Sequence, residues 1–213
     1  MSSVNQNMSD PGQASADRIP AAERREQILA AASHVFGQRG YAGATTDQVA
    51  QAAGISQPYV VRMFGSKENL FVEVLNRARV RLLDAFRAVL ADAAAASLPR
   101  EELVASLGRA YADLIEDRGI VLSLMQGFVI GHEPVIGATA RAGFVEIYRL
   151  LRAEGGFTAE EAMSFLAHGM LFNTLVALRL TDHYGEDASA DELLACTFGT
   201  KLETVLKATG AAE

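Results

Sequence analysis

The segment Thr45–Phe64, TTDQVAQAAGISQPYVVRMF, carries the pattern that decides the fold. It predicts two short helices, one from Thr45 to Ala53 and one from Gln57 to Phe64. Between them, Gly54-Ile55-Ser56 predicts a tight break. Two short helices joined by a glycine-containing turn are typical of a helix-turn-helix, whose second helix enters the major groove of DNA.

Local signals support both helix starts. Thr45 and Gln48 have the spacing of a capping box, in which each residue satisfies a backbone N–H of the other. Ser56 is a suitable N-cap for the second helix, and Pro58 is tolerated in a first helical turn.

The second helix is predicted to have two faces. Val60 and Phe64 lie four residues apart and can both face the core. The opposite face carries groups that can read base edges and hold phosphates, and these are Tyr59, Arg62 and Met63, with Gln57 and Pro58 at the leading end.

Helical periodicity dominates the rest of the chain, and no convincing alternating strand is found. A helix from Ala22 to Gln38 is expected to stop at Arg39-Gly40, and Ser66 is expected to cap a long fourth helix that reaches the alanine run at 93–96. Capping boxes at Thr158/Glu161 and Ser189/Glu192 mark the starts of the last two helices. The prediction is an all-α fold of about nine helices, the later ones near 100–118, 119–130, 134–154, 159–181 and 190–208.

Charge divides the chain unequally. Residues 18–81 hold nine Lys/Arg and five Asp/Glu, whereas residues 82–213 hold ten and 19. A basic N-terminal third beside an acidic remainder indicates a polyanionic partner for the former only. Residues 1–17 are rich in Ser, Asn, Gln and Gly and are expected to form a disordered tail that is no signal peptide.

The N-terminal region resembles the TetR family of transcriptional regulators. The resemblance covers about residues 20–75 and is specific because several motifs recur at fixed spacing. The matching stretches are Gly40–Ala50 (GYAGATTDQVA), Ala53–Ser56 (AGIS) and Phe64–Leu70 (FGSKENL).

The resemblance implies a two-fold dimer with an N-terminal DNA-binding domain, expected at 18–81, joined through the long helix to a ligand-binding and dimerisation domain at 82–213. It also implies that Thr45 and Thr46 meet a phosphate, and that Lys67 contacts the DNA backbone. The full set of residues expected at the DNA is Thr45, Thr46, Gln57, Pro58, Tyr59, Arg62 and Lys67.

Two positions depart from the family pattern: Val61 stands where a phosphate-contacting Tyr is usual, and Met63 where Tyr or His is frequent. The operator sequence therefore does not follow from the resemblance. Two groups of arginines have competing interpretations. Arg77, Arg79 and Arg81 are interpreted mainly as a solvated face, with contact to the DNA backbone as the alternative. Arg18, Arg24 and Arg25 are a weaker candidate for an arm toward DNA, with ordinary surface positions as the alternative.

No motif in the C-terminal region identifies a ligand. Its aromatic and apolar side chains are mostly core, but a cavity among them would suit an aromatic or lipophilic effector. His168 and Asn173 are its polar candidates, although a hydrogen-bonded core histidine is the preferred interpretation of His168. The residues expected at the ligand are Phe86, Tyr111, Met125, Phe128, Phe144, Tyr148, His168 and Phe172.

The resemblance further implies that the last two helices pair with their copies in a four-helix interface. The apolar surface expected there includes Gly169, Leu171, Leu175, Leu178, Cys196, Phe198 and Leu202. Cys196, the only cysteine, is expected to be a buried thiol, which fits a reducing cytoplasm.

These observations predict a cytoplasmic homodimeric repressor that binds a palindromic operator in double-stranded DNA and is released by a small molecule. No cofactor, metal or membrane partner is expected. An activator or a ligand-independent DNA-binding regulator is the alternative. An enzyme is disfavoured because the four histidines show no metal-ligand spacing, and no phosphate loop or nucleophile motif is found.

Overall fold

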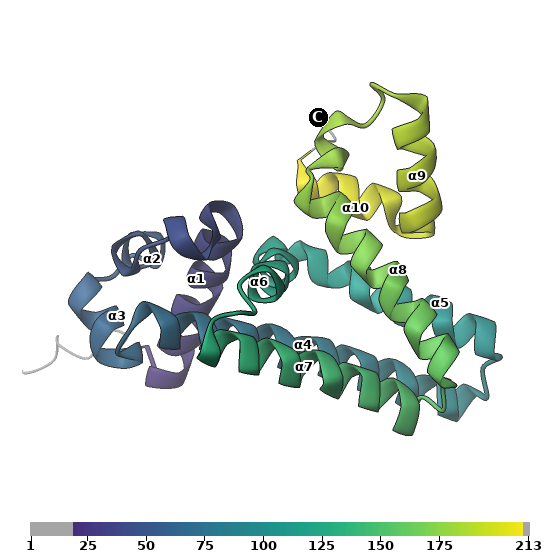
Figure 1. Cartoon of the computed structure of the whole chain (residues 1–213), viewed down its shortest axis with the longest axis horizontal. Coiled ribbons are helices and arrows are strands. Elements are labelled where there is room, and N and C mark those ends of the chain that lie inside the picture. The colour runs from purple at the N-terminus through teal and green to yellow at the C-terminus, as the bar shows by residue number, and fades with distance from the viewer. Residues whose placement is uncertain (1–18, 211–213) are drawn as a thin grey trace, which may run out of the picture.

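The computed structural model describes residues 19–210, and every regular element among them is helical (Figure 1). The predicted all-α fold is thus confirmed for this part of the chain; the expected tail at 1–17 lies outside it. The α-helices are α1 (Ala21–Gly43), α2 (Thr46–Ala52), α3 (Gln57–Phe64), α4 (Lys67–Ala96), α5 (Arg100–Asp113), α6 (Arg118–Val129), α7 (Pro134–Ala153), α8 (Ala159–Ala177), α9 (Ala188–Phe198) and α10 (Leu202–Thr209).

Helices α1, α2 and α3 and the start of α4 enclose one apolar core. Phe36 from α1 meets Phe71 from α4 edge to face, with ring centroids 4.8 Å apart. Val49 from α2 and Val60 from α3 are fully buried in the same cluster. These helices are short, so their stability depends mainly on this shared packing.

The predicted stop at Gly40 is a sharp break inside the chain's first helix. Gly40 has φ +69° and ψ 166°, a conformation that L side chains rarely adopt. The helical segment continues to Gly43 beyond this kink, and Ala44 then leads into Thr45, the N-cap of α2.

In the C-terminal region, α4 and α7 lie side by side along one edge of the molecule, and α8 and α5 cross above one end of them (Figure 1). Helices α9 and α10 form a lobe at the far end of α8. The apolar side chains gather in two clusters, one centred on Phe86 and Leu151 and another on Ile115 and Leu194.

Three of the predicted C-terminal helices are shorter than expected because each runs into a 3₁₀ segment. These segments are η1 (Leu114–Glu116), η2 (Leu180–His183) and η3 (Gly199–Lys201). The break before the last helix falls at Gly199, which has φ +52° and divides the expected helix 190–208 into α9 and α10.

The two predicted capping boxes have different outcomes. Thr158 and Glu161 form theirs at the start of α8. The box expected from Ser189 does not form, because Asp187 is the N-cap of α9 and its carboxylate accepts from the backbone N–H groups of Ser189 and Ala190. The Asp187 carboxylate, two residues before Ser189, is a charged acceptor and therefore binds the free N–H groups at the start of α9 in place of the Ser189 side chain.

No single helix within residues 19–210 is both long and apolar enough to cross a membrane. Helices α6 and α7 meet that test only as a pair, with a bend of 118° between them.

Candidate DNA-binding surface and effector cavity

Helix α3 presents the two faces that its sequence predicts. Val60 and Phe64 are buried in the N-terminal core, which confirms their predicted direction. Arg62 and Val61 are exposed, and Tyr59 and Met63 are half-buried at the edge of the core. The surface open to a partner therefore carries one arginine and the edge of one tyrosine.

Arg62 is held against Tyr59. Its guanidinium lies 4.9 Å from the centre of the Tyr59 ring, one helical turn nearer the N-terminus of α3. A guanidinium above an aromatic ring is attracted to the negative face of the ring. Its N–H donors lie in the guanidinium plane, so they remain available for hydrogen bonds to a partner. The pair thus brings a positive charge toward the leading end of α3.

Three of the polar residues expected at DNA have structural roles, one as the cap of α2 and two in a bond between α2 and α3. Thr45 forms the predicted capping box with Gln48: Thr45 Oγ1 accepts from the Gln48 backbone N–H at 3.2 Å, and Gln48 Oε1 accepts from Thr45 N–H at 3.1 Å. Gln57 Nε2 donates to Thr46 Oγ1 at 3.2 Å, so the first residue of α3 is tied to the first residue of α2. Ser56 stands at the N-cap of α3, but its side chain makes no capping bond.

Lys67 has a structural role that the sequence did not reveal. Its Nζ donates to the backbone carbonyls of Tyr41 at 3.0 Å, Ala44 at 3.2 Å and Ala42 at 3.5 Å, and it lies 4.6 Å from the centre of the Tyr41 ring. An ammonium has three donors. Any contact from Lys67 to a DNA phosphate would have to share them with these carbonyls at the end of α1.

The interpretation of Arg77 as part of a solvated face is wrong. Its side chain is only 6% exposed, and it bridges Glu26 on α1 at 2.7 Å and Asp117, just before α6, at 2.8 Å. Arg81 reaches the same two carboxylates, and Arg79 pairs with Glu146 on α7. These α4 arginines face carboxylates on neighbouring helices because α4 is covered along much of its length.

Helix α6 meets α1 in a close backbone contact beside this ion-pair cluster. A Cβ added at Gly119 would lie 2.5 Å from the Ser33 carbonyl carbon, a distance that real Cβ atoms do not show. Gly37 makes the matching approach from α1, toward Gly119 and Leu122. The two glycines therefore let an element of the DNA-binding region touch an element of the C-terminal region backbone to backbone.

A cavity of about 780 Å³ lies between α5, α8 and the inner ends of α4, α6 and α7. Of the residues expected at a ligand, the structure places six on its wall: Phe86, Tyr111, Phe128, Phe144, His168 and Phe172. The remaining lining is mixed: apolar side chains such as Leu82, Leu124 and Phe165 face the cavity, and the charged residues on its wall are Arg109, Glu160, Glu161 and Lys201. The aromatic and aliphatic part of the wall resembles pockets that bury apolar ligands.

Met125 and Tyr148 do not line this cavity. Leu124 and Phe128 lie four residues apart on α6 and take the cavity-facing positions, so Met125 projects about a quarter-turn away from them. Tyr148 packs at the edge of the cluster around Leu151, and its hydroxyl accepts from Arg152 at 3.1 Å.

The polar groups at the cavity bond chiefly to the protein itself. Tyr111 donates its hydroxyl proton to Asn173 Oδ1 at 2.5 Å. Burial raises the pKa of Tyr111 to about 12, although the bond to Asn173 acts to lower it. His168 Nε2 lies 3.0 Å from the Thr197 carbonyl, so this nitrogen donates; the residue is hydrogen-bonded as expected, but at the exposed rim instead of in the core.

Sequence reasoning missed several lining residues from the ends of helices, among them Arg109, Lys201 and Cys196. Cys196 is exposed in this chain, so its predicted burial is wrong. No periodic signal distinguishes these positions, because they meet only where α9 ends beside α5. Within residues 19–210, no three His, Cys, Asp or Glu side chains are grouped as a metal site would need.

Comparison with known proteins agrees with this architecture. Residues 28–74 match the family model described as "Bacterial regulatory proteins, tetR family". The chain is 32% identical over 152 residues to the HTH-type transcriptional activator FasR of Mycolicibacterium smegmatis, a match that covers 68% of this chain and 67% of FasR. The chain belongs to the TetR family.

Other members differ in the direction of regulation. The HTH-type transcriptional repressor AcnR of Corynebacterium glutamicum is 25% identical over 182 residues, which cover 85% of this chain and 77% of AcnR. A TetR-like transcriptional regulator from a Rhodococcus species has a similar solved structure, with a TM-score of 0.60 at 24% identity, covering 85% of this chain and 97% of that one. This TetR-family chain is a DNA-binding transcriptional regulator, and the relatives named here are regulators and not enzymes.

Proposed function

We propose that this TetR-family chain represses transcription as a homodimer, with α3 of each protomer in the major groove of a palindromic operator. A small apolar or aromatic ligand in the 780 Å³ cavity would release it from DNA. Residues 18–81 would bind DNA and residues 82–213 would bind the ligand and dimerise, a division that fits the basic charge of the first range and the acidic charge of the second.

One observation carries the coupling between ligand and DNA. Helix α6 contributes Leu124 and Phe128 to the cavity wall, and the same helix rests on α1 through Gly119 and Ser33. A ligand that displaces α6 therefore also displaces α1, on which α2 and α3 are packed. A ligand must bind the two arrangements with different affinity to shift their populations, and a coupling of about 1–3 kcal/mol is typical.

The outer surface of α8 and α9 supports the dimer. Met163, Leu171 and Leu178 on α8 and Leu193 on α9 are large apolar side chains that remain exposed in the single chain. Leu175 and Phe198, which we expected at this interface, instead face the chain's own core. A two-fold dimer through this surface would hold two copies of α3 at the half-site spacing of about 34 Å.

Among the residues expected at DNA, we propose that Arg62 and Tyr59 make the principal direct contacts. Thr46 and Gln57 would act mainly by fixing the angle between α2 and α3, because their side chains bond to each other, and Thr45 would act by capping α2. Pro58 would pack against the DNA at the leading end of α3. Because the operator is chromosomal, the protein would work in the cytoplasm.

Activation is the second candidate function, because the relative FasR is a transcriptional activator. Both functions use the same DNA surface and differ in where the operator lies relative to the promoter. A reporter gene driven by the bound promoter separates them: deletion of the regulator raises expression if it represses and lowers expression if it activates.

DNA binding is tested by fluorescence anisotropy with a 40-bp duplex that the wild-type protein selects from a random library. We expect Arg62→Ala and Tyr59→Ala each to weaken binding at least tenfold, because each removes a contact with desolvated DNA groups. Arg152→Ala, an exposed arginine on α7, is the matched control. Unchanged affinity in both α3 variants would show that α3 does not read the operator.

Release by ligand is tested by thermal shift with a panel of apolar and aromatic compounds, followed by anisotropy with each hit. A compound that stabilises the wild-type protein but not Phe172→Ala, and that weakens DNA binding, supports the proposal. A compound that binds the free and the DNA-bound protein equally would argue against coupling.

A further inference from the structure

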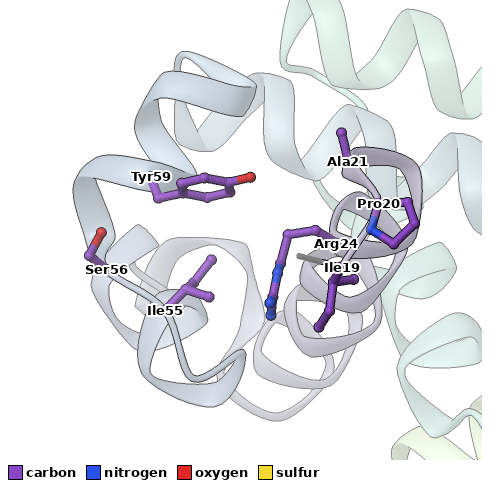
Figure 2. A pocket seen from close by; sticks show the side chains of 7 residues that line it. All are labelled: Ile19, Pro20, Ala21, Arg24, Ile55, Ser56 and Tyr59. Carbon is purple, nitrogen blue, oxygen red and sulfur yellow. The ribbon is translucent and has the colours of Figure 1, made fainter. Parts of the chain in front are cut away.

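A second cavity lies beside the recognition helix and has no role in the function described so far. It measures about 630 Å³ and is formed between the N-terminal end of α1 and the turn before α3. Figure 2 shows Arg24 entering it from α1 and Tyr59 entering it from α3, with Ile55 on its floor. The remaining lining residues are Ile19, Pro20, Ala21 and Ser56.

Arg24 differs from the other arginines of α1 and α4 in its partners. Arg25 is paired with Glu73 at 3.1 Å, and Arg77 and Arg81 are paired with Glu26 and Asp117. The bond that Arg24 makes goes to a neutral acceptor, Gln27 Oε1, at 3.1 Å. Among the side chains described within residues 19–210, no carboxylate forms an ion pair with Arg24.

The position of the Arg24 guanidinium beside α3 indicates which kind of group it would bind. Tyr59 belongs both to the DNA-facing surface of α3 and to the wall of this groove, so the groove opens directly beside the helix proposed to enter the major groove. The two edges of a major groove are formed by the sugar–phosphate backbones of the DNA strands. Arginine is suited to bind a phosphate there because the planar N–H donors of its guanidinium match the geometry of two phosphate oxygens.

We propose that this groove receives the DNA backbone at the edge of each half-site and that Arg24 binds a phosphodiester there. The proposal rests on α3 being the recognition helix. In the bound state, Arg24 exchanges its bond to Gln27 for a charged phosphate oxygen, while Tyr59 closes the groove from the α3 side. Arg24 positions the protein without reading sequence.

The test uses the full-length protein and the 40-bp selected duplex, with binding constants measured from 50 to 300 mM salt. Each lost phosphate contact reduces the slope of log K against log salt by about 0.9. A dimer of Arg24→Ala loses two such contacts, so we expect its slope to be about 1.8 lower than that of the wild type. At low salt its affinity should fall about tenfold, on selected and random duplexes alike.

Two further variants make the result specific. Arg24→Lys keeps the charge and should recover most of the slope, whereas Arg24→Gln keeps a polar side chain and should behave like Arg24→Ala. Arg87→Ala removes an exposed arginine from the C-terminal part of α4, paired with Glu154, and should leave the slope unchanged. Duplexes with single methylphosphonates should contain one position per half-site that weakens the wild type but not Arg24→Ala.

The outcomes separate this inference from the proposed function. If Tyr59→Ala and Arg62→Ala lose binding while Arg24→Ala keeps the wild-type slope, the groove does not hold a phosphate and the inference is overturned. If all three variants bind as the wild type does, α3 is not the recognition helix and both proposals fail. A lower slope confined to Arg24→Ala and Arg24→Gln supports the groove as a phosphate site.

Discussion

The N-terminal and C-terminal regions of this chain are packed in different ways. Helices α1 to α3 and the start of α4 surround a single continuous core in which Phe36, Val49, Val60 and Phe71 are fully buried. The C-terminal helices instead divide their apolar side chains between two clusters and leave a cavity of about 780 Å³ beside them.

This difference in packing fits a division of roles in which the N-terminal region recognises DNA and the C-terminal region responds to a ligand. A close-packed core holds α3 at one angle, which a helix in the major groove requires, because tightly packed interiors resist small displacements. A region with a large cavity can rearrange around an occupant at lower cost. In the proposed mechanism, the close contact between Gly119 and Ser33 is where a movement of one region would reach the other.

The strongest test of this difference in packing is to replace one phenylalanine in each region by alanine. Phe36→Ala should lower the free energy of unfolding by about 3–5 kcal/mol, because it opens a new void in a filled core. Phe172→Ala should cost about 2 kcal/mol less, since Phe172 already borders the cavity. Urea unfolding at one fixed protein concentration measures both. Equal losses would mean that the C-terminal region is packed as closely as the N-terminal one.

The junction between the regions is tested at Arg77. Arg77→Ala removes the more buried of the two arginines that Glu26 and Asp117 share, and we expect a loss of about 2 kcal/mol in the free energy of unfolding. The partial exposure of both carboxylates and their remaining contacts with Arg81 keep the loss below that of a fully buried pair. Arg87→Ala, an exposed ion pair on the same helix, should cost less than about 1 kcal/mol. Similar losses in the two variants would remove the argument that Arg77 joins the regions.

Alkaline pH should weaken the C-terminal region through Tyr111. Its pKa is about 12 in the folded chain and about 10 when unfolded, so the folded state holds the proton more tightly. The stability that it contributes is complete below pH 10 and is lost as pH rises from 10 toward 12 and beyond, with about 2 kcal/mol lost by pH 11.5 and about 2.7 kcal/mol in all. Unfolding measured at pH 9 and pH 11.5 should show this loss in the wild type and in Tyr184→Phe but not in Tyr111→Phe.

The smallest predicted effect is a gain of stability at Gly108. This glycine lies on α5 at the cavity wall, and a Cβ added there meets nothing within 4 Å. Gly108→Ala should stabilise the protein by about 1 kcal/mol, because alanine favours a helix more than glycine does. Gly119→Ala is the contrasting variant, since its Cβ collides with Ser33 and should destabilise the chain. A loss of stability in both would show that α5 needs the flexibility of glycine.

The DNA-binding region could be predicted from sequence because its signals are local. The capping box at Thr45, the turn glycine Gly54 and the spacing of Val60 and Phe64 each act within a few residues, and the structure contains all of them. The same kind of signal placed Thr158 at the start of α8. Short-range hydrogen bonds and backbone sterics depend little on the rest of the fold, so such residues retain their roles.

What only the tertiary structure decided are the partners of groups far apart in the chain. The sequence could not show that Lys67 binds the carbonyls at the end of α1, that Arg77 lies between Glu26 and Asp117, or that Tyr148 points away from the cavity. Long charged side chains form hydrogen bonds and ion pairs, and aromatic rings form packing contacts, with the groups that helix packing places beside them. Local sequence therefore determined most of the elements and several of their caps, while helix packing determined which charged groups pair within residues 19–210 and where the cavities lie.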